Sequence, residues 1–109
     1  MAKPTLQQVF GAGASQTATT FTITKADLLR LTASASNTAE QLLSAILVTA
    51  QSYLTQTNFD VNIDQSLVIA DGYTSNTVRG TNNTQYRSDQ LTISLSKIDT
   101  QTTIEPDDY

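Results

Sequence analysis

The stretch NTAEQLLSAILVTAQSYLT, from Asn37 to Thr55, decides the fold because it is the clearest helix in the sequence. Asn37 can accept a hydrogen bond from the first free amides, and Glu40 follows three residues later, which is typical of a helix start. Apolar residues then recur at spacings of three and four, at Leu42, Leu43, Ile46, Leu47, Ala50, Tyr53 and Leu54. The sequence therefore predicts an amphipathic helix over about residues 38–55 with one buried face.

Stretches on both sides of this helix predict β-strands. Before it, the segment from Thr19 to Thr24 alternates, with Phe21 and Ile23 on one face. After it come two more alternating segments and one unbroken apolar run, at residues 59–63, 91–95 and 66–70 respectively. Alternation is typical of half-buried strands, and a short apolar run is typical of a strand covered on both faces.

The connections favour antiparallel pairing. Asp71-Gly72 is a turn signal, so we expect a hairpin formed by Ser66 to Ala70 and Tyr73 to Val78. The segment RGTNNTQYRS, from Arg79 to Ser88, is expected to be a loop. Strands joined by short turns pair antiparallel. The predicted fold class is therefore α+β, with one helix packed on a small antiparallel sheet.

The N-terminal segment is predicted to lie outside that core as an arm, residues 1–18, because Gly11 to Thr19 is small and flexible. Ahead of that tether, Leu6, Val9 and Phe10 have the spacing of one helical stripe. We expect these three residues to contact a partner. The alternative is that the arm folds back and Phe10 fills its own core.

The C-terminal segment, residues 99–109, is expected to be an acidic tail. Pro106 and three acidic residues keep it out of a sheet. Ile104 and Tyr109 are its expected apolar contact residues. The alternative is that the tail is a disordered acidic end when the protein is alone. The expected organisation is thus an arm over 1–18, a single α+β domain over 19–98 and a tail over 99–109.

The polar residues are mostly uncharged. Thr, Ser, Gln and Asn supply 45 of the 109 residues, while charged residues make up 15%, against about 25% in ordinary soluble proteins. A neighbouring protein can cover such a surface without stripping water from many ions, which is the costly step. The composition therefore favours a protein that is covered by other chains.

Charge and hydropathy exclude two classes of partner. The net charge is −4, and the six basic residues are scattered along the chain, whereas binding a phosphate backbone needs a basic face. No apolar run approaches the roughly 20 residues that span a bilayer, and the first ten residues lack the apolar stretch of a signal peptide. We expect neither nucleic acid nor membrane as a partner, and a protein made in the cytoplasm.

The sequence contains neither Cys nor His. It therefore lacks thiolate nucleophiles, disulfides, and both the commonest general base and the commonest metal ligand. Asp60, Asn62 and Asp64 partly match a calcium loop, but Gln65 stands where that loop needs glycine. We expect no enzyme activity, no cofactor and no metal site.

Three segments carry a resemblance to a known class of proteins: PTLQQVFGAGASQTATTFTI, the Asn-Thr-Ala-Glu helix start, and DQLTISLSKIDTQTTIEPDDY. They resemble small acidic virion structural proteins of tailed bacteriophages, notably those infecting cyanobacteria. The resemblance implies a capsid cement (decoration) protein that bridges major capsid subunits, located in the virion, and it carries over no catalytic residue.

Two alternatives to the cement protein stay open. One is a tail, neck or baseplate component of the same kind of particle, and the other is a cytoplasmic adaptor that binds a peptide on its sheet edge. In each case the partners are protein subunits, and we expect a homo-oligomer, for example a dimer. Tyr86 and Arg87 join the expected contact residues of the arm and tail because Tyr and Arg are enriched at interface hot spots.

Overall fold

The predicted main helix is present in the computed structural model of the chain, which describes residues 2–99 and 103–109. This helix, α2, spans Ala39–Tyr53. Its N-cap is Thr38 and not Asn37: the Thr38 hydroxyl accepts a hydrogen bond from the Gln41 amide, and the Gln41 side chain accepts one from the Thr38 amide. Asn37 instead closes the preceding loop by accepting a hydrogen bond from the Ser34 amide.

The N-terminal segment forms structure of its own. Helix α1 (Leu6–Phe10) begins at Thr5, which makes a capping box with Gln8, and it packs on α2 with Val9 buried. Strands β1 (Ser15–Gln16) and β2 (Phe21–Thr22) then pair antiparallel, so the predicted strand over 19–24 is reduced to two residues. The segment thus folds back onto its own core, while the partner contact of its residues stays a prediction.

The predicted strand over 59–63 is wrong, because most of that segment is helix α3 (Gln56–Val61). The Thr55 hydroxyl accepts a hydrogen bond from the Asn58 amide over 3.1 Å, and the Asn58 side chain donates to the Tyr53 carbonyl over 2.7 Å. These polar contacts fix the first turn of a helix directly after α2. Alternation in so short a segment does not distinguish strand from helix.

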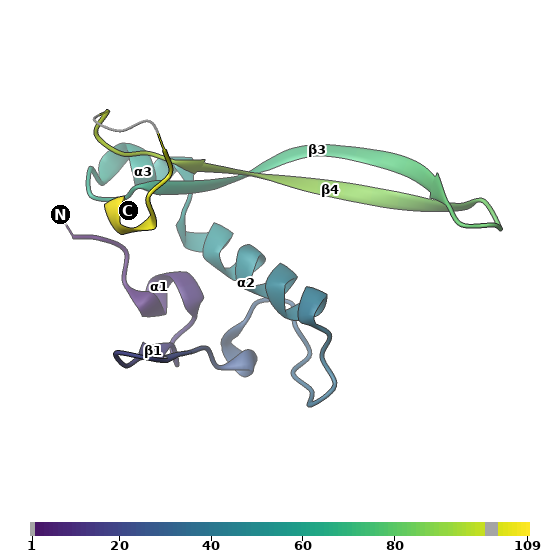
Figure 1. Ribbon diagram of the computed structural model, residues 1–109, viewed down its shortest axis with the longest axis horizontal. Coiled ribbons are helices and arrows are strands. Elements are labelled where there is room, and N and C mark those ends of the chain that lie inside the picture. Colours follow the sequence, from purple (N-terminus) through teal and green to yellow (C-terminus); the bar gives the residue numbers. More distant parts are fainter. Residues whose placement is uncertain (1, 100–102) are drawn as a thin grey trace.

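Two long strands form an antiparallel hairpin (Figure 1): β3 (Leu67–Arg79) and β4 (Thr84–Leu95), with register from Leu67 opposite Leu95 to Arg79 opposite Thr84. The predicted turn at Asp71-Gly72 is wrong, since the register shifts there by a β-bulge and β3 continues. The predicted loop over 79–88 is wrong except at residues 80–83. Gly80 (φ 83°) and Asn83 (φ 52°) carry the real turn in the left-handed region.

Gly72 explains why the Asp-Gly pair suits a bulge. A Cβ atom on Gly72 would lie 3.0 Å from the Cβ of Gln90 and 3.2 Å from its carbonyl oxygen. A side chain there would be tightly packed and would require Gln90 to shift by a few tenths of an ångström. A bulge is a position at which glycine is commonly found.

The core joins the helices to the start of the hairpin. Val9, Ala50, Leu54 and Ile69 form the buried cluster, and partly buried apolar residues pack around it: Phe10, Tyr53, Leu67 and Leu91. The Ile69 amide donates to the Leu54 carbonyl over 2.9 Å, which ties β3 to the end of α2. A main helix with small antiparallel sheets makes the fold α+β, as predicted.

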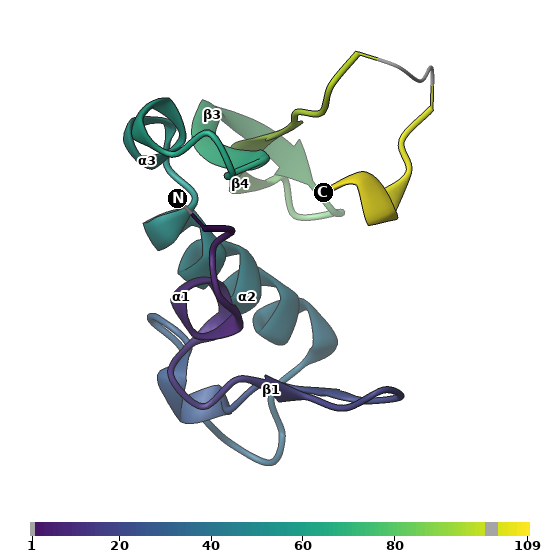
Figure 2. The same ribbon diagram turned by 90° about the vertical axis from the view of Figure 1, so that its left-hand side faces the viewer.

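The helices, the β1–β2 pair and the start of the hairpin, residues 67–71 and 91–95, are called the base below. The molecule is elongated because the rest of the hairpin projects from this base. Its extents are 51 × 33 × 25 Å and its radius of gyration is 16.6 Å, against about 13 Å for a spherical domain of this length. Viewed from the end, α1, α2 and the β1–β2 pair lie below the hairpin, and α3 lies beside it (Figure 2). α1 and α2 lie near one end of the hairpin, and its turn is at the far end (Figure 1).

Candidate protein–protein interface

The half of the hairpin beyond the bulge, residues 74–89, is called the hairpin arm below. Every residue from 70 to 90 is exposed. Large apolar side chains are among them, with Val78 61% exposed, Tyr86 45% exposed and Tyr73, next to the arm, 83% exposed. No residue of the arm is therefore buried within the described part of the chain, although Thr74, Arg87 and Asp89 line a cavity together with Val48 and Gln51 of α2.

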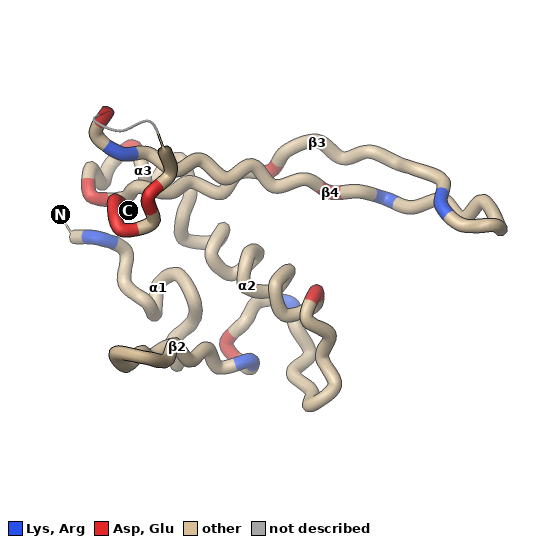
Figure 3. Tube along the Cα trace, in the orientation of Figure 1, with Lys and Arg blue, Asp and Glu red and all other residues tan. Residues whose placement is uncertain are grey.

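The composition of the arm accounts for this exposure. Ten of its sixteen residues are Thr, Ser, Asn or Gln. These polar side chains interact well with water. Thr is also common in β-strands. Most of the arm carries no charge, as Figure 3 shows. Its surface can be covered by another chain at a low desolvation cost.

The backbone of the arm also has unpaired edges. Among the described residues, β3 and β4 form a sheet of two strands, so each strand has a partner on one side. An isolated two-stranded hairpin is marginally stable in water. Unpaired strand edges offer hydrogen-bonding groups to another chain.

An ion pair between Arg87 and Asp89 lies on the surface of the arm. The Arg87 Nε donates to Asp89 Oδ1 over 2.9 Å, and the Thr74 hydroxyl donates to the same oxygen over 3.1 Å. The hydrogen bond from Arg87 is the main cause that lowers the pKa of Asp89 from its ordinary value. Nearby, the guanidinium of Arg79 lies 5.2 Å from the centre of the Tyr86 ring. Both contacts are exposed and contribute little to stability.

A second candidate surface lies where the two ends of the chain meet the base. A cavity of about 330 Å³ is lined by Lys3, Pro4, Val9, Phe10, Leu54, Ser66, Leu67 and Tyr109. The tail reaches it through the 3-10 turn η2 (Pro106–Asp108). Lys97 holds the tail by an ion pair with Asp108 at 3.2 Å, a hydrogen bond to the Thr103 carbonyl, and a contact with the Tyr109 ring.

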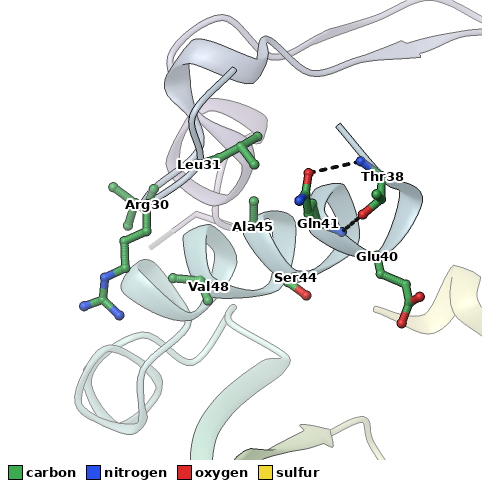
Figure 4. Close-up of a pocket in the computed structure, with 9 residues that line it drawn as sticks. Arg30, Leu31, Thr38, Glu40, Gln41, Ser44, Ala45 and Val48 are labelled. Carbon is green, nitrogen blue, oxygen red and sulfur yellow. Dashed lines mark hydrogen bonds between the residues drawn. The ribbon is translucent and has the colours of Figure 1, made fainter. Parts of the chain in front are cut away.

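A second cavity, of about 500 Å³, lies between α2 and the loop before it. Its lining residues include Arg30 and Glu40, which lie at opposite ends of the cavity (Figure 4). The loop is fixed to the helix by the Leu29 amide, which donates to the Thr49 hydroxyl over 2.9 Å. The cavity thus brings the start of α2 and the loop before it to one surface, with the two charged side chains at its ends.

The described residues hold no group of three or more acidic, His or Cys side chains that could bind a metal ion. Two of the residues that partly match a calcium loop make other contacts: Asp60 accepts a hydrogen bond from Gln56 within α3, and Asn62 donates to the Ala2 carbonyl. Over residues 2–99 and 103–109, no helix is both long and apolar enough to cross a membrane.

The structure divides the predicted contact residues between these surfaces. Three of them, Val9, Phe10 and Tyr109, line the cavity of about 330 Å³ near the two chain ends, called the terminal cavity below, although Val9 is buried. Tyr86 and Arg87 lie on β4 in the hairpin arm. Leu6 is half-buried on α1, and Ile104 is exposed in the tail, outside both sets.

Further exposed residues of the hairpin were not among the predicted contact residues: Tyr73, Thr74, Val78 and Asp89. The segment from Tyr73 to Val78 was predicted as a strand paired with Ser66 to Ala70, and the segment from Arg79 to Ser88 as a loop, so the pairing of β3 with β4 in the arm was missed. The β-propensity of Thr, Val and Tyr on both sides of Asn82-Asn83 was the signal that could have indicated two strands.

The hairpin arm and the terminal cavity are thus the candidate contact surfaces, and the arm is the larger feature. No protein-family model matches the chain, and neither a curated protein nor a solved structure matches it at a significant level.

Proposed function

We propose that the chain is a structural protein of a bacteriophage particle, of the capsid cement class, which stabilises contacts between major capsid subunits. The observation that carries the proposal is the hairpin arm, in which every residue is exposed and neither strand has a second neighbour among the described residues. A hairpin that its own chain does not support becomes stable when another protein covers it.

The composition of the arm supports the same conclusion. Its Thr, Ser, Asn and Gln side chains can exchange hydrogen bonds with water for hydrogen bonds with a neighbouring subunit. Because a shell repeats each contact many times, a modest affinity per subunit is multiplied by effective concentration. The base then holds the arm in place, through the bond between the Ile69 amide and the Leu54 carbonyl.

The copy number of the protein in purified particles tests this proposal. We expect quantitative mass spectrometry of the particles to find it in numbers comparable to the major capsid protein. Particles lacking the chain should lose their contents at a lower temperature, and adding the purified protein should restore the stability. A copy number of six or twelve would instead indicate a ring in the tail, neck or baseplate.

The exposed strand edges also favour a second candidate, a cytoplasmic adaptor that binds an extended peptide on β3 or β4. This candidate predicts a protein that is absent from purified particles and that binds a partner in the free cytoplasm. The same mass spectrometry therefore separates the two candidates.

A further inference from the structure

The two outer edges of the hairpin differ in regularity. On β3, the register shift between Asp71 and Thr74 inserts an extra residue, and Asp71 is held by the Gln51 side chain over 2.9 Å. On β4, pairing continues without an extra residue from Thr84 to Leu95. Because a bulge twists an edge and interrupts pairing, β4 has the edge that is better suited to accept another strand.

The charges along that edge are self-complementary. Arg87 and Asp89 flank Ser88 at equal distances in sequence. If a second β4 strand pairs antiparallel about Ser88, Arg87 lies opposite Asp89 of the partner subunit, and Asp89 lies opposite Arg87 of the partner subunit. Opposite charges in directly opposed positions stabilise a strand pair, and like charges destabilise it.

The same charges select one register. A shift of two residues in either direction would place Arg87 opposite its own copy or Asp89 opposite its own copy, each a repulsive pair. Pairing about Ser88 avoids both. The charge pattern therefore distinguishes this arrangement from its nearest symmetric alternatives.

We propose that the chain forms a two-fold symmetric dimer in which the β4 strands of two copies pair antiparallel about Ser88. The paired arms form one sheet of four strands, in the order β3, β4, β4, β3, with the two bases at opposite ends. An isolated two-stranded hairpin is marginally stable in water, and a sheet of four strands is more stable than that. The contact is isologous, as in most protein dimers. This inference concerns the isolated chain and does not depend on a role in a particle.

Sedimentation equilibrium of the purified full chain tests the charge pairing. We expect the wild-type protein to reach twice the 11.8 kDa monomer mass at high concentration. The variants Arg87→Asp and Asp89→Arg, each alone, should self-associate about tenfold or more weakly, because each places two like pairs at the contact. Mixing the two variants restores opposite charges at both positions and should restore the dimer.

The mixing experiment separates the proposed contact between chains from a simpler explanation, the loss of an ion pair within one chain. Both single variants also lose the ion pair that Arg87 makes with Asp89 within one chain. Mixing two chains cannot restore an intrachain pair, but it restores the pairs between chains. If the mixture stays monomeric while the wild type is a dimer, the proposed contact is wrong.

Disulfide trapping tests the position of the axis. Directly opposed residues have Cα atoms about 4.5–5.5 Å apart in an antiparallel pair, within reach of a disulfide. Because the chain has no cysteine, Ser88→Cys should give a covalent dimer under mild oxidation. Ser75→Cys is the matched control, since Ser75 lies opposite Ser88 in the hairpin but on β3. Equal trapping of both variants, trapping of Ser75→Cys alone, or a wild-type chain that stays monomeric overturns the proposal.

Discussion

The base and the hairpin arm are built from the same two strands, yet they differ in what surrounds them. In the base, Ile69 of β3 is 5% exposed and packs with Val9, Ala50 and Leu54 from the helices. In the arm, all side chains of the same strands are exposed. Strand pairing alone therefore does not determine whether a segment becomes part of the core or part of the surface. Contacts on the faces of the sheet make one end a core and leave the other end as a surface.

This comparison predicts that substitutions in the base change stability while equivalent substitutions in the arm change association. Burial of apolar area stabilises the base, and the arm buries almost none. Each prediction below therefore pairs a residue of one region with a chemically similar residue of the other.

The largest effect is expected for Leu54→Ala. Leu54 is buried in the core cluster, and removing such a side chain costs about 2–5 kcal/mol of unfolding free energy. Chemical denaturation followed by circular dichroism measures the loss. Val78→Ala, in the arm, is the control and should change the unfolding free energy by less than about 0.5 kcal/mol. Equal losses in both variants would show that the arm is part of the core.

The next effect concerns Gln65, a buried polar residue that is 3% exposed. Its side-chain amide donates to the carbonyls of Thr55 and Leu67 over 3.2 and 2.8 Å, which ties the end of α2 to the start of β3. Gln65→Ala leaves both carbonyls without this donor and should cost about 1–3 kcal/mol in the same denaturation experiment. Gln85→Ala is the exposed counterpart in the arm, and a comparable cost there would contradict the account.

A smaller loss is expected at the start of α2. Thr38→Ala removes the hydroxyl that accepts a hydrogen bond from the Gln41 amide over 3.1 Å, which typically costs about 1 kcal/mol. Thermal unfolding should show a lower midpoint. Thr81→Ala at the exposed turn of the hairpin should leave the midpoint unchanged, since Thr81 caps no helix.

The smallest effect is a change in titration within the arm. Since the hydrogen bond from Arg87 lowers the pKa of Asp89, the stabilisation by this pair is present above the ordinary carboxyl pKa and is lost as the pH falls through the lowered value. Arg87→Gln should therefore raise the pKa of Asp89 toward its ordinary value, as followed by NMR of the side-chain carboxyl. Lys25→Gln in the base should leave this titration unchanged. An unaltered Asp89 pKa in Arg87→Gln would show that the pair does not form in solution.

The periodic parts of the fold were predictable from sequence. The helix over about 38–55 shows apolar residues at helical spacing, and Ala50 and Leu54 of that stripe are buried in the core. The strand at 91–95 was predictable from its alternation, although only Leu91 packs against the core and Ile93 and Leu95 are exposed. α3 was missed because its helix is fixed by Thr55 and Asn58, whose polar contacts leave no apolar period.

The part of the hairpin arm beyond Val78 was interpreted as a loop for the same reason. Alternation of apolar and polar residues reveals a strand only when one face is buried, and neither face of the arm is buried by its own chain. The Asp71-Gly72 pair was predicted to be a turn, but it forms a bulge within a continuous strand. Tyr86 and Arg87 were therefore predicted as contact residues without the strand that carries them.

Hydrogen exchange of the backbone amides tests the central claim most directly, namely that the arm depends on other chains for its stability. In dilute, monomeric protein, we expect amides of residues 74–89 to exchange much faster than those of α2, because local opening is easiest where few apolar contacts exist. When the protein is assembled with its partner subunits, the amides of the arm should become protected while those of α2 change little. Arm amides that are as protected as α2 in the monomer, or that stay unprotected after assembly, would contradict the account.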